Sequence, residues 1–205
     1  MLNMINEILK TKTYPEFKKQ LAAYDCQECA LGAGRANLVV DRGNYRSDTM
    51  IIGEAPGKDE DEQGKPFVGR SGKLMNQLLI EQGFDTNQDA LVANIAKCRP
   101  PNNRPPTIKE ATQCKSYLFK QIELMQPKYI LLMGRTAVKH ILPHLTKVPM
   151  NTLVQNSYAD EAFPNTRFFI FFHPAYILRD PRKKPLMQQL ITHFLQQKLP
   201  RVCQE

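Results

Sequence analysis

Tryptophan and long hydrophobic runs are both missing from this sequence. None of the 205 residues is Trp, so only Phe and Tyr are present for stacking on a planar ligand. No stretch of about 18 consecutive apolar residues occurs, and we therefore expect no membrane-spanning helix. The first residues, 1–7, contain neither the basic region nor the apolar core of a secretory signal peptide. We therefore expect a cytoplasmic protein.

Cysteine is scarce, but its spacing is informative. Cys26 and Cys29 form a C-x2-C pair, Cys98 and Cys114 follow much later, and Cys203 lies near the end. A disulfide framework is not expected in an intracellular chain. Four thiolates suit either structural zinc or an iron–sulfur cluster. The simpler alternative is a set of unrelated buried cysteines, and spacing alone does not decide between them.

Acidic residues are fewer than basic ones. The chain has 20 Asp and Glu against 28 Lys and Arg, which gives a net charge of +8 and a pI near 9.3. This balance favours a polyanionic partner such as nucleic acid, although many basic proteins bind none. Length and apolar content suit one domain, 1–205, with a sizeable core. Roughly the first 20 residues are expected to form a peripheral helical extension.

Predicted strands and helices alternate along the chain. Short apolar runs predict buried strands at 49–52, 90–95, 129–133 and 167–172. Apolar residues at helical spacing predict helices at 14–24, 71–82, 107–125, 136–142 and 185–198. Thr107 and Glu110 form a capping box for the third of these helices, and Gly83 ends the second. The alternation predicts an α/β fold of three layers, α/β/α, around a central, mostly parallel, four-stranded sheet.

One long loop, 53–69, follows the first predicted strand. It contains four Gly and two Pro, together with a run of carboxylates and one aromatic residue, Phe67. Ligands in open α/β sheets bind at loops that follow the carboxyl ends of strands. The Gly and Pro content favours a fixed backbone that lets a ligand approach closely. We expect a planar or polar ligand here.

Three predicted strands each end in a polar residue, namely Glu54, Asn94 and His173. The carboxyl ends of parallel strands meet at one edge of a sheet, so these side chains should converge near Phe67. An aromatic ring can stack on a heterocycle, an amide can read its polar edge, and an imidazole can donate to an oxygen that becomes negative. Each residue also has an ordinary alternative role, as a solvated charge, a turn cap, a half-buried histidine or a core phenylalanine.

Three sequence blocks occur in a characteristic order. They are GEAPG and GKPFVG within 53–69, NIAKCRPP followed by NR within 94–104, and HPAYILR at 173–179. Together with the four-cysteine spacing, these blocks resemble the family 4 uracil-DNA glycosylases, the iron–sulfur branch of the uracil-DNA glycosylase superfamily. The resemblance spans most of the chain. It implies a monofunctional repair enzyme that hydrolyses the N-glycosidic bond of flipped-out deoxyuridine in DNA, releasing uracil and leaving an abasic site.

The resemblance implies roles for the loop residues. Uracil would stack on Phe67, and Asn94 would read its N3 and O4 edge. His173 would hydrogen-bond uracil O2 and stabilise the departing anion, while Glu54 would serve water or the oxocarbenium ion. Glu60 is the competing carboxylate for that second role. The implied uracil-binding residues are Glu54, Ala55, Pro56, Gly57, Phe67, Asn94 and His173.

Further implied roles concern a cofactor and DNA. Cys26, Cys29, Cys98 and Cys114 would ligate a [4Fe–4S] cluster of structural function, and Cys203 would remain a free thiol. Ile177 is expected on an exposed loop, where it would fill the gap left by the flipped base. The expected DNA-binding residues are Ser71, Arg99, Arg104, Tyr176, Ile177, Leu178 and Arg179.

The implied partner is uracil-containing DNA, single- or double-stranded, bound by a monomer with activity at the nucleoid. A glycosylase for another deaminated or modified base is a related alternative. A non-catalytic uracil-DNA-binding module, such as a DNA polymerase accessory, would bind such DNA without leaving alkali-labile sites. A cluster-bearing electron carrier would cycle between redox states without needing the cleft residues.

Overall fold

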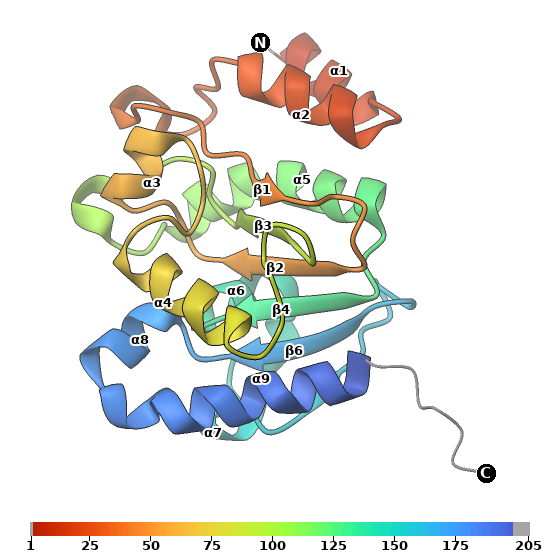
Figure 1. Ribbon diagram of the computed structural model, residues 1–205. Helices are drawn as coiled ribbons and strands as arrows, with labels where there is room; N and C mark the ends of the chain where they lie inside the picture. Colours follow the sequence, from red (N-terminus) through yellow and green to blue (C-terminus); the bar gives the residue numbers. More distant parts are fainter. Residues whose placement is uncertain (1, 199–205) are drawn as a thin grey trace.

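A computed structural model describes residues 2–198, so the expected free thiol of Cys203 lies outside the described residues. Its centre is a six-stranded sheet with the order β1-β3-β2-β4-β6-β5 (Figure 1). Strands β2, β3, β4 and β6 pair in parallel, whereas β1 and β5 pair antiparallel at the two edges. The strands are β1 (Arg42–Gly43), β2 (Thr49–Gly53), β3 (Leu91–Asn94), β4 (Tyr129–Met133), β5 (Ser157–Tyr158) and β6 (Arg167–Phe171).

The prediction of a four-stranded sheet is therefore wrong, because the sheet is mixed and has two additional edge strands. The four predicted strands are the central parallel ones, with ends within two residues of the prediction. Strands β1 and β5 have two residues each, too few to display the alternation of side chains by which a strand is recognised. Pairing with a neighbour, rather than local sequence, makes these segments extended.

Helices cover both faces of the sheet. Figure 1 shows α4 and α9 on the near side and α5 and α6 on the far side. Every residue of β2 and β3 is buried, as expected for parallel strands enclosed by helices. The helices are α1 (Leu2–Lys10), α2 (Tyr14–Ala23), α3 (Lys58–Gln63), α4 (Arg70–Ile80), α5 (Ile108–Met125), α6 (Arg135–Ile141), α7 (Met150–Leu153), α8 (Pro174–Arg179) and α9 (Lys184–Lys198).

Helix α5 begins as the sequence predicts. Thr107 Oγ1 accepts a hydrogen bond from the backbone N–H of Glu110 at 3.2 Å, and Glu110 Oε2 accepts one from the N–H of Thr107 at 2.7 Å. This reciprocal capping satisfies two N–H groups that the helix itself leaves without a partner. The N-terminal helices α1 and α2 pack against α5, where Ile8, Phe17 and Tyr117 share a small apolar core.

Two short helices, α3 and α8, lie in segments that the sequence indicates as loops. Gly57 precedes α3 and Gly64 ends it in the left-handed conformation, with a φ of 66°. Pro174 occupies the first position of α8, where its fixed φ suits a helix start. Both helices are near the sheet edge at which β2 and β6 end (Figure 1). Within residues 2–198, no helix is long and apolar enough to cross a membrane.

Candidate active site

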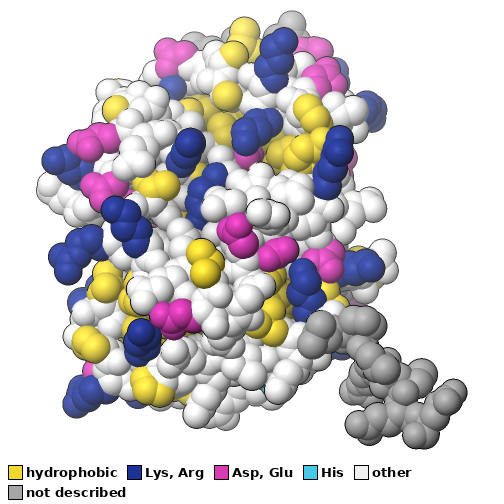
Figure 2. Space-filling view, in the orientation of Figure 1, with side chains coloured by type: hydrophobic (Ala, Val, Ile, Leu, Met, Phe, Trp, Pro, Cys, Tyr) yellow, Lys and Arg dark blue, Asp and Glu magenta, His cyan; other side chains and the backbone are white. Residues whose placement is uncertain are grey.

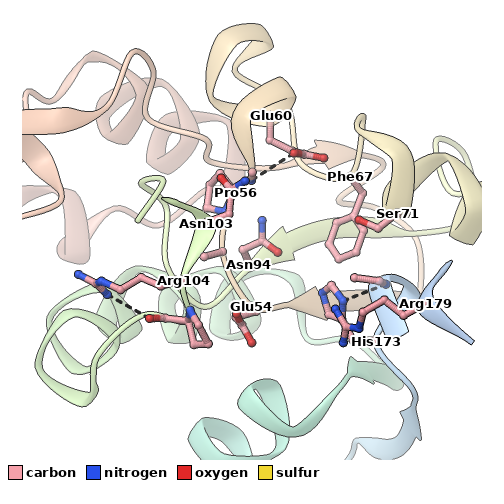
Figure 3. Close-up of a pocket in the computed structure, with 14 residues that line it drawn as sticks. Glu54, Pro56, Glu60, Phe67, Ser71, Asn94, Asn103, Arg104, His173 and Arg179 are labelled. Carbon is pink, nitrogen blue, oxygen red and sulfur yellow. Dashed lines mark hydrogen bonds between the residues drawn. The ribbon is translucent and has the colours of Figure 1, made fainter. Parts of the chain in front are cut away.

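A cleft of about 460 Å³ opens at the carboxyl edge of the parallel strands. Glu54 follows β2, Asn94 ends β3, and His173 follows β6, so the expected convergence of three strand ends is present (Figure 3). The residues that line the cleft are Glu54, Ala55, Pro56, Gly57, Glu60, Phe67, Ser71, Asn94, Asn103, Arg104, Pro105, His173, Ala175 and Arg179.

Asn94 presents a buried amide to the cleft. Its exposed fraction is 2%, and among the hydrogen bonds of the described residues none involves its side chain. In Figure 3 the amide lies at the centre of the cleft. No side-chain nitrogen or oxygen in residues 2–198 is both fully buried and without a partner, so the amide atoms of Asn94 are open to the cleft. A ligand that removes them from water without offering a partner would lose about 1–3 kcal/mol. The position therefore suits a ligand that supplies both a donor and an acceptor.

Phe67 forms one wall of the cleft from an unusual backbone conformation. Its φ is 57°, in the left-handed region that few non-glycine residues occupy, and its side chain is buried. Backbone strain of this kind is found at functional sites, where the surrounding structure maintains it. A Cβ on Gly53 would lie 2.4 Å from the Phe67 ring and 2.5 Å from Asn94 Oδ1. Glycine at this position therefore lets the ring and the amide lie side by side.

Arg42 stabilises the backbone that carries Phe67. Its Nε donates to the carbonyl oxygen of Pro66 at 2.8 Å, and its Nη2 donates to Asn76 Oδ1 at 2.8 Å. The Asn76 amide in turn donates to the carbonyl oxygen of Phe67 at 3.4 Å. The sequence gives no role to Arg42 or Asn76, since each is an ordinary polar residue far from the motif that it supports.

His173 is the N-cap of α8, and its ring is held in one tautomer. Nδ1 accepts a hydrogen bond from the backbone N–H of Ala175 at 3.2 Å, so the proton of the neutral ring is on Nε2. Burial lowers the pKa of His173; the charge of Glu54 opposes this effect, and that of Arg179 adds to it. The site therefore holds a neutral imidazole with an N–H donor.

The two candidate carboxylates differ in their surroundings. Glu60 accepts hydrogen bonds from three backbone N–H groups, those of Gly57 at 3.1 Å, Val68 at 3.0 Å and Gly69 at 2.8 Å. It thereby joins the start of α3 to the segment after Phe67. In the described part of the chain, Glu54 has one side-chain hydrogen bond, which its Oε2 accepts from Thr136 Oγ1. Glu54 Oε1 has none there.

The three basic residues expected to bind DNA, Arg99, Arg104 and Arg179, differ in their position and in their hydrogen bonds. Arg104 forms a bidentate pair with Glu110, at 2.8 and 2.7 Å, and this hydrogen bonding lowers the pKa of Glu110 to about 2. Arg179 and Ser71 line the cleft as expected. Arg99 lies outside it, beside a neighbouring groove of about 300 Å³, and its Nε donates to Asn103 Oδ1 at 2.7 Å.

The expectation that Ile177 is exposed on a loop is wrong. Ile177 lies within helix α8 and is 2% exposed, because it faces the apolar core. Leu178, the next residue, is 38% exposed and turns to solvent. Tyr176 is partly buried, and its ring centroid lies 5.4 Å from that of Phe172. Successive residues of a helix point about 100° apart, so in α8 Ile177 can face the core while Leu178 faces solvent.

The four cysteines Cys26, Cys29, Cys98 and Cys114 line one small cavity. Three polar groups approach their sulfurs. The Lys97 backbone N–H donates to Cys114 Sγ at 3.2 Å, Arg35 Nη1 donates to Cys98 Sγ at 4.0 Å, and the Tyr117 hydroxyl shares a hydrogen bond of 3.8 Å with Cys26 Sγ, in which either group could be the donor.

Burial and the nearby thiols raise the pKa of Cys98 to about 12, and burial raises that of Cys114 to about 11. In residues 2–198, no three His, Cys, Asp or Glu side chains are arranged to hold one metal ion. Converging thiols that resist ionisation by themselves are chemically suited to a cationic group, because such a group would stabilise each sulfur as the thiolate that binds it.

The structure thus brings together most of the predicted site and adds to it. Arg99, Tyr176, Ile177 and Leu178 do not line the cleft, whereas the other predicted uracil-binding, catalytic and DNA-binding residues do. Asn103, Pro105 and Ala175 line it without a predicted role, and Thr136 contacts it through Glu54. Asn103 and Ala175 lie within two of the three sequence blocks, and membership of those blocks is the signal that points to them.

Comparison with known proteins places the chain in a family. The family model of the uracil DNA glycosylase superfamily matches residues 40–196 of this chain. The chain is 38% identical over 159 residues to the type-4 uracil-DNA glycosylase of Thermotoga maritima, over 76% of this chain and 79% of that protein. It is 36% identical over 172 residues to that of Sulfurisphaera tokodaii (80% and 76%) and 36% over 160 residues to that of Archaeoglobus fulgidus (77% and 80%). The chain therefore belongs to the uracil DNA glycosylase superfamily and, within it, to the family of type-4 uracil-DNA glycosylases.

Proposed function

We propose that this protein hydrolyses the N-glycosidic bond between uracil and deoxyribose in DNA, releasing free uracil and leaving an abasic site. The observation that carries the proposal is the Asn94 amide, which belongs to a buried residue, has no hydrogen bond within the described residues and is open only to a cleft beside Phe67 and His173. A base inside a duplex cannot reach such a cleft, so the deoxyuridine must be flipped out of the stack.

Asn94 distinguishes uracil from cytosine. The amide oxygen accepts the N3–H of uracil, and the amide N–H donates to O4. Cytosine carries an acceptor at N3 and an amine at position 4, so with the amide in the orientation required by uracil both hydrogen bonds would face a like group. Buried polar groups that are left unpaired in this way reject a wrong substrate strongly. Phe67 contributes a stacking face that any base could use, and it therefore supplies affinity rather than selectivity.

His173 stabilises the leaving group. When the bond between C1′ and N1 breaks, its electron pair stays with uracil and negative charge develops on O2. The Nε2–H of the neutral ring donates to that oxygen, and the hydrogen bond strengthens as the charge grows. A donor that is already oriented by Ala175 needs no reorganisation during the reaction. Loss of one such donor lowers kcat on the order of 10²–10³-fold.

Glu54 is the carboxylate that acts on the sugar side. Its Oε1 has no hydrogen bond in the described part of the chain, so it is available to orient water and to stabilise positive charge at C1′. All three hydrogen bonds of Glu60 serve the backbone of the cleft wall. Glu60 therefore shapes the cleft next to the bound base, and Glu54 takes the chemical role.

The four cysteines ligate a [4Fe–4S] cluster in this proposal. Their convergence on one cavity and the donation of Lys97 N–H and Arg35 Nη1 to their sulfurs support it. Bound there, the cluster would cross-link the segment after α2, the loop after β3 and helix α5. Cys98 lies between Asn94, at the end of β3, and the loop that carries Arg99 and Arg104. The cluster would therefore hold this segment in place, which is a structural function.

The protein approaches DNA, single- or double-stranded, as a monomer through the cleft edge. Arg179 and Ser71 line this edge, and Leu178 is exposed next to Arg179. Figure 2 shows several Lys and Arg side chains along the side where α3, α4 and α8 lie. Cations there would meet phosphates, and the apolar Leu178 takes the place in the duplex that the flipped base leaves.

A uracil-release assay tests this function. Wild type, Asn94→Ala and His173→Ala are incubated with a duplex that contains one deoxyuridine, and free uracil and alkali-labile sites are measured. We expect release by wild type and on the order of 10²–10³-fold slower release by His173→Ala, with DNA affinity nearly unchanged. Binding of the duplex without any release by wild type would instead identify a non-catalytic binding module. Release of a different base from other duplexes, and not of uracil, would identify a different glycosylase.

A further inference from the structure

The end of β4 lies between the two strand ends that carry catalytic groups. In the sheet order β3-β2-β4-β6, β4 is the neighbour of both β2 and β6. Glu54 follows β2 and His173 follows β6. The turn from β4 into α6, at Gly134 and Arg135, must therefore pass beside both residues. The sequence motifs draw attention to the other three strand ends and leave this one without a function.

The turn contacts His173 closely. Gly134 has a φ of 88°, and a Cβ there would lie 2.8 Å from the Cβ of His173. Its N–H donates to the carbonyl oxygen of Phe171 at 2.9 Å. Arg135 Nη1 fixes the start of α6 from the other side, through the carbonyl oxygens of Thr146 at 3.0 Å and Val148 at 2.6 Å. The β4–α6 turn is therefore fixed by hydrogen bonds at both Gly134 and Arg135.

Thr136, in the first turn of α6, donates a hydrogen bond from Oγ1 to Glu54 Oε2. This contact joins residues 82 positions apart in the sequence. A hydrogen bond to an ionised carboxylate is stronger than one between neutral groups. Threonine also has few side-chain rotamers, so its hydroxyl is directed with little loss of entropy. One carboxylate oxygen is thereby engaged, and Oε1 is the oxygen left for the substrate.

We propose that Thr136 is a positioning residue for Glu54: its hydroxyl binds Oε2 and so presents Oε1 to the water and the sugar. The inference rests on the proposed glycosylase function. It assigns to the β4–α6 turn the orientation of the catalytic carboxylate, while the same turn supports His173 through Gly134. Thr136 itself is not among the residues that line the cleft.

The test compares Thr136→Val, which removes the hydroxyl at nearly constant shape, with Thr136→Ser, which keeps it. Glu54→Gln and the double variant Glu54→Gln/Thr136→Val complete a double-mutant cycle. Thr192→Val is the matched control, because Thr192 Oγ1 also donates from a helix to a side chain, Gln82 Oε1 at 2.6 Å, at a position away from the cleft lining. Single-turnover release of uracil, the affinity for a duplex containing 2′-fluoro-2′-deoxyuridine and the melting temperature are measured for each.

The inference predicts a rate of release about ten- to a hundredfold lower for Thr136→Val, with unchanged affinity for the fluorinated duplex. Thr136→Ser should recover most of the rate, and Thr192→Val should equal wild type. In the Glu54→Gln background, Thr136→Val should cause no further loss. An equal loss in both backgrounds, a wild-type rate for Thr136→Val, or no rescue by serine would each overturn the inference.

If Thr136→Val does not fold, the serine variant and Thr136→Ala in the two Glu54 backgrounds provide the same cycle. The proposed function is decided separately by wild type in the same assay. Failure of wild type to release uracil contradicts the function, whereas release by wild type with no effect of Thr136 substitution contradicts only the positioning role.

Discussion

Gly72 packs directly against the backbone of Phe67: a Cβ on Gly72 would lie 2.2 Å from the carbonyl carbon and oxygen of Phe67. Helix α4 therefore approaches the cleft wall as closely as a glycine permits. Because Phe67 has a φ of 57°, its backbone depends on such neighbours to stay in that conformation. The stacking ring is thus positioned from α4 as well as from the loop that precedes it.

Substitution Gly72→Ala should displace Phe67 and weaken the binding of substrate. We expect KM for uracil-containing DNA to rise about tenfold or more, since the stacked base loses on the order of 1–3 kcal/mol. Steady-state kinetics on a single-uracil duplex measures this effect. Gly34→Ala is the matched control, because a Cβ on Gly34 would meet no atom within 4 Å. Equal KM values for both variants would contradict the role assigned to Gly72.

The pH dependence of the reaction should reflect His173. Burial lowers the pKa of this residue, so the folded enzyme keeps the ring neutral at and above its ordinary pKa of 6.5. Protonation at lower pH would place a proton on Nδ1, where the N–H of Ala175 already points, and would break that hydrogen bond. We expect kcat to be constant above pH 6.5 and to fall only at a more acidic pH. In His173→Ala this decrease should be absent, and a decrease that begins well above pH 6.5 would contradict the assignment.

His173 should also make the free energy of unfolding depend on pH. Because the folded-state pKa lies below 6.5, the unfolded chain binds more protons in the window between the two values. The free energy of unfolding should therefore decrease as the pH falls from 6.5 through the folded-state pKa. Denaturant titrations of wild type and His173→Ala between pH 7 and about pH 5 measure this difference. A wild-type stability that increases over this window relative to the variant would contradict the assigned burial.

Glu54 and Glu60 should affect different kinetic constants. Glu60→Gln places an amide N–H or a weaker acceptor against the backbone N–H groups of Val68 and Gly69, so it should disturb the cleft wall and raise KM. Glu54→Gln leaves the wall intact and should lower kcat by about tenfold or more. Kinetics of both variants on the same duplex test this division. A reversed pattern, with kcat lost only in Glu60→Gln, would assign the chemistry to Glu60.

Metal analysis tests the cysteine site independently of activity. The proposal predicts about four iron atoms and about four acid-labile sulfides per chain, with visible charge-transfer absorption. Cys98→Ala should lose iron and should lower the melting temperature, because the loop after β3 would no longer be joined to the segment after α2. Zinc in place of iron, with no sulfide, would contradict the cluster while leaving the structural role of the site intact.

The sequence predicts the central fold well because its signals are local. The four long strands are continuous apolar runs, and Thr107 with Glu110 marks the start of α5 by residue type alone. The edge strands β1 and β5 depend on pairing with β3 and β6, and a two-residue strand carries no periodicity. The sequence places Ile177 wrongly because a proline after the histidine indicates a turn, although proline also suits the first position of a helix.

The candidate site likewise contains residues that the sequence predicts and residues that it does not. Asn94, Phe67 and His173 lie within recognisable motifs and are predicted, whereas Thr136 and Arg42 act through tertiary contacts with residues 82 and 24 positions away. Such residues have no local signature, since any threonine in a helix or any surface arginine has the same appearance in the sequence. The distinction between Glu54 and Glu60 also depends on tertiary hydrogen bonds, and only the structure separates the two carboxylates.

The most direct test of the account is a crystal structure of the protein bound to DNA that contains 2′-fluoro-2′-deoxyuridine, which resists hydrolysis. We predict that the uracil ring stacks on Phe67, that N3 and O4 lie within about 3 Å of the Asn94 amide, and that O2 lies within about 3 Å of His173 Nε2. A flipped base bound elsewhere, with the Asn94 amide still without a partner, would contradict it.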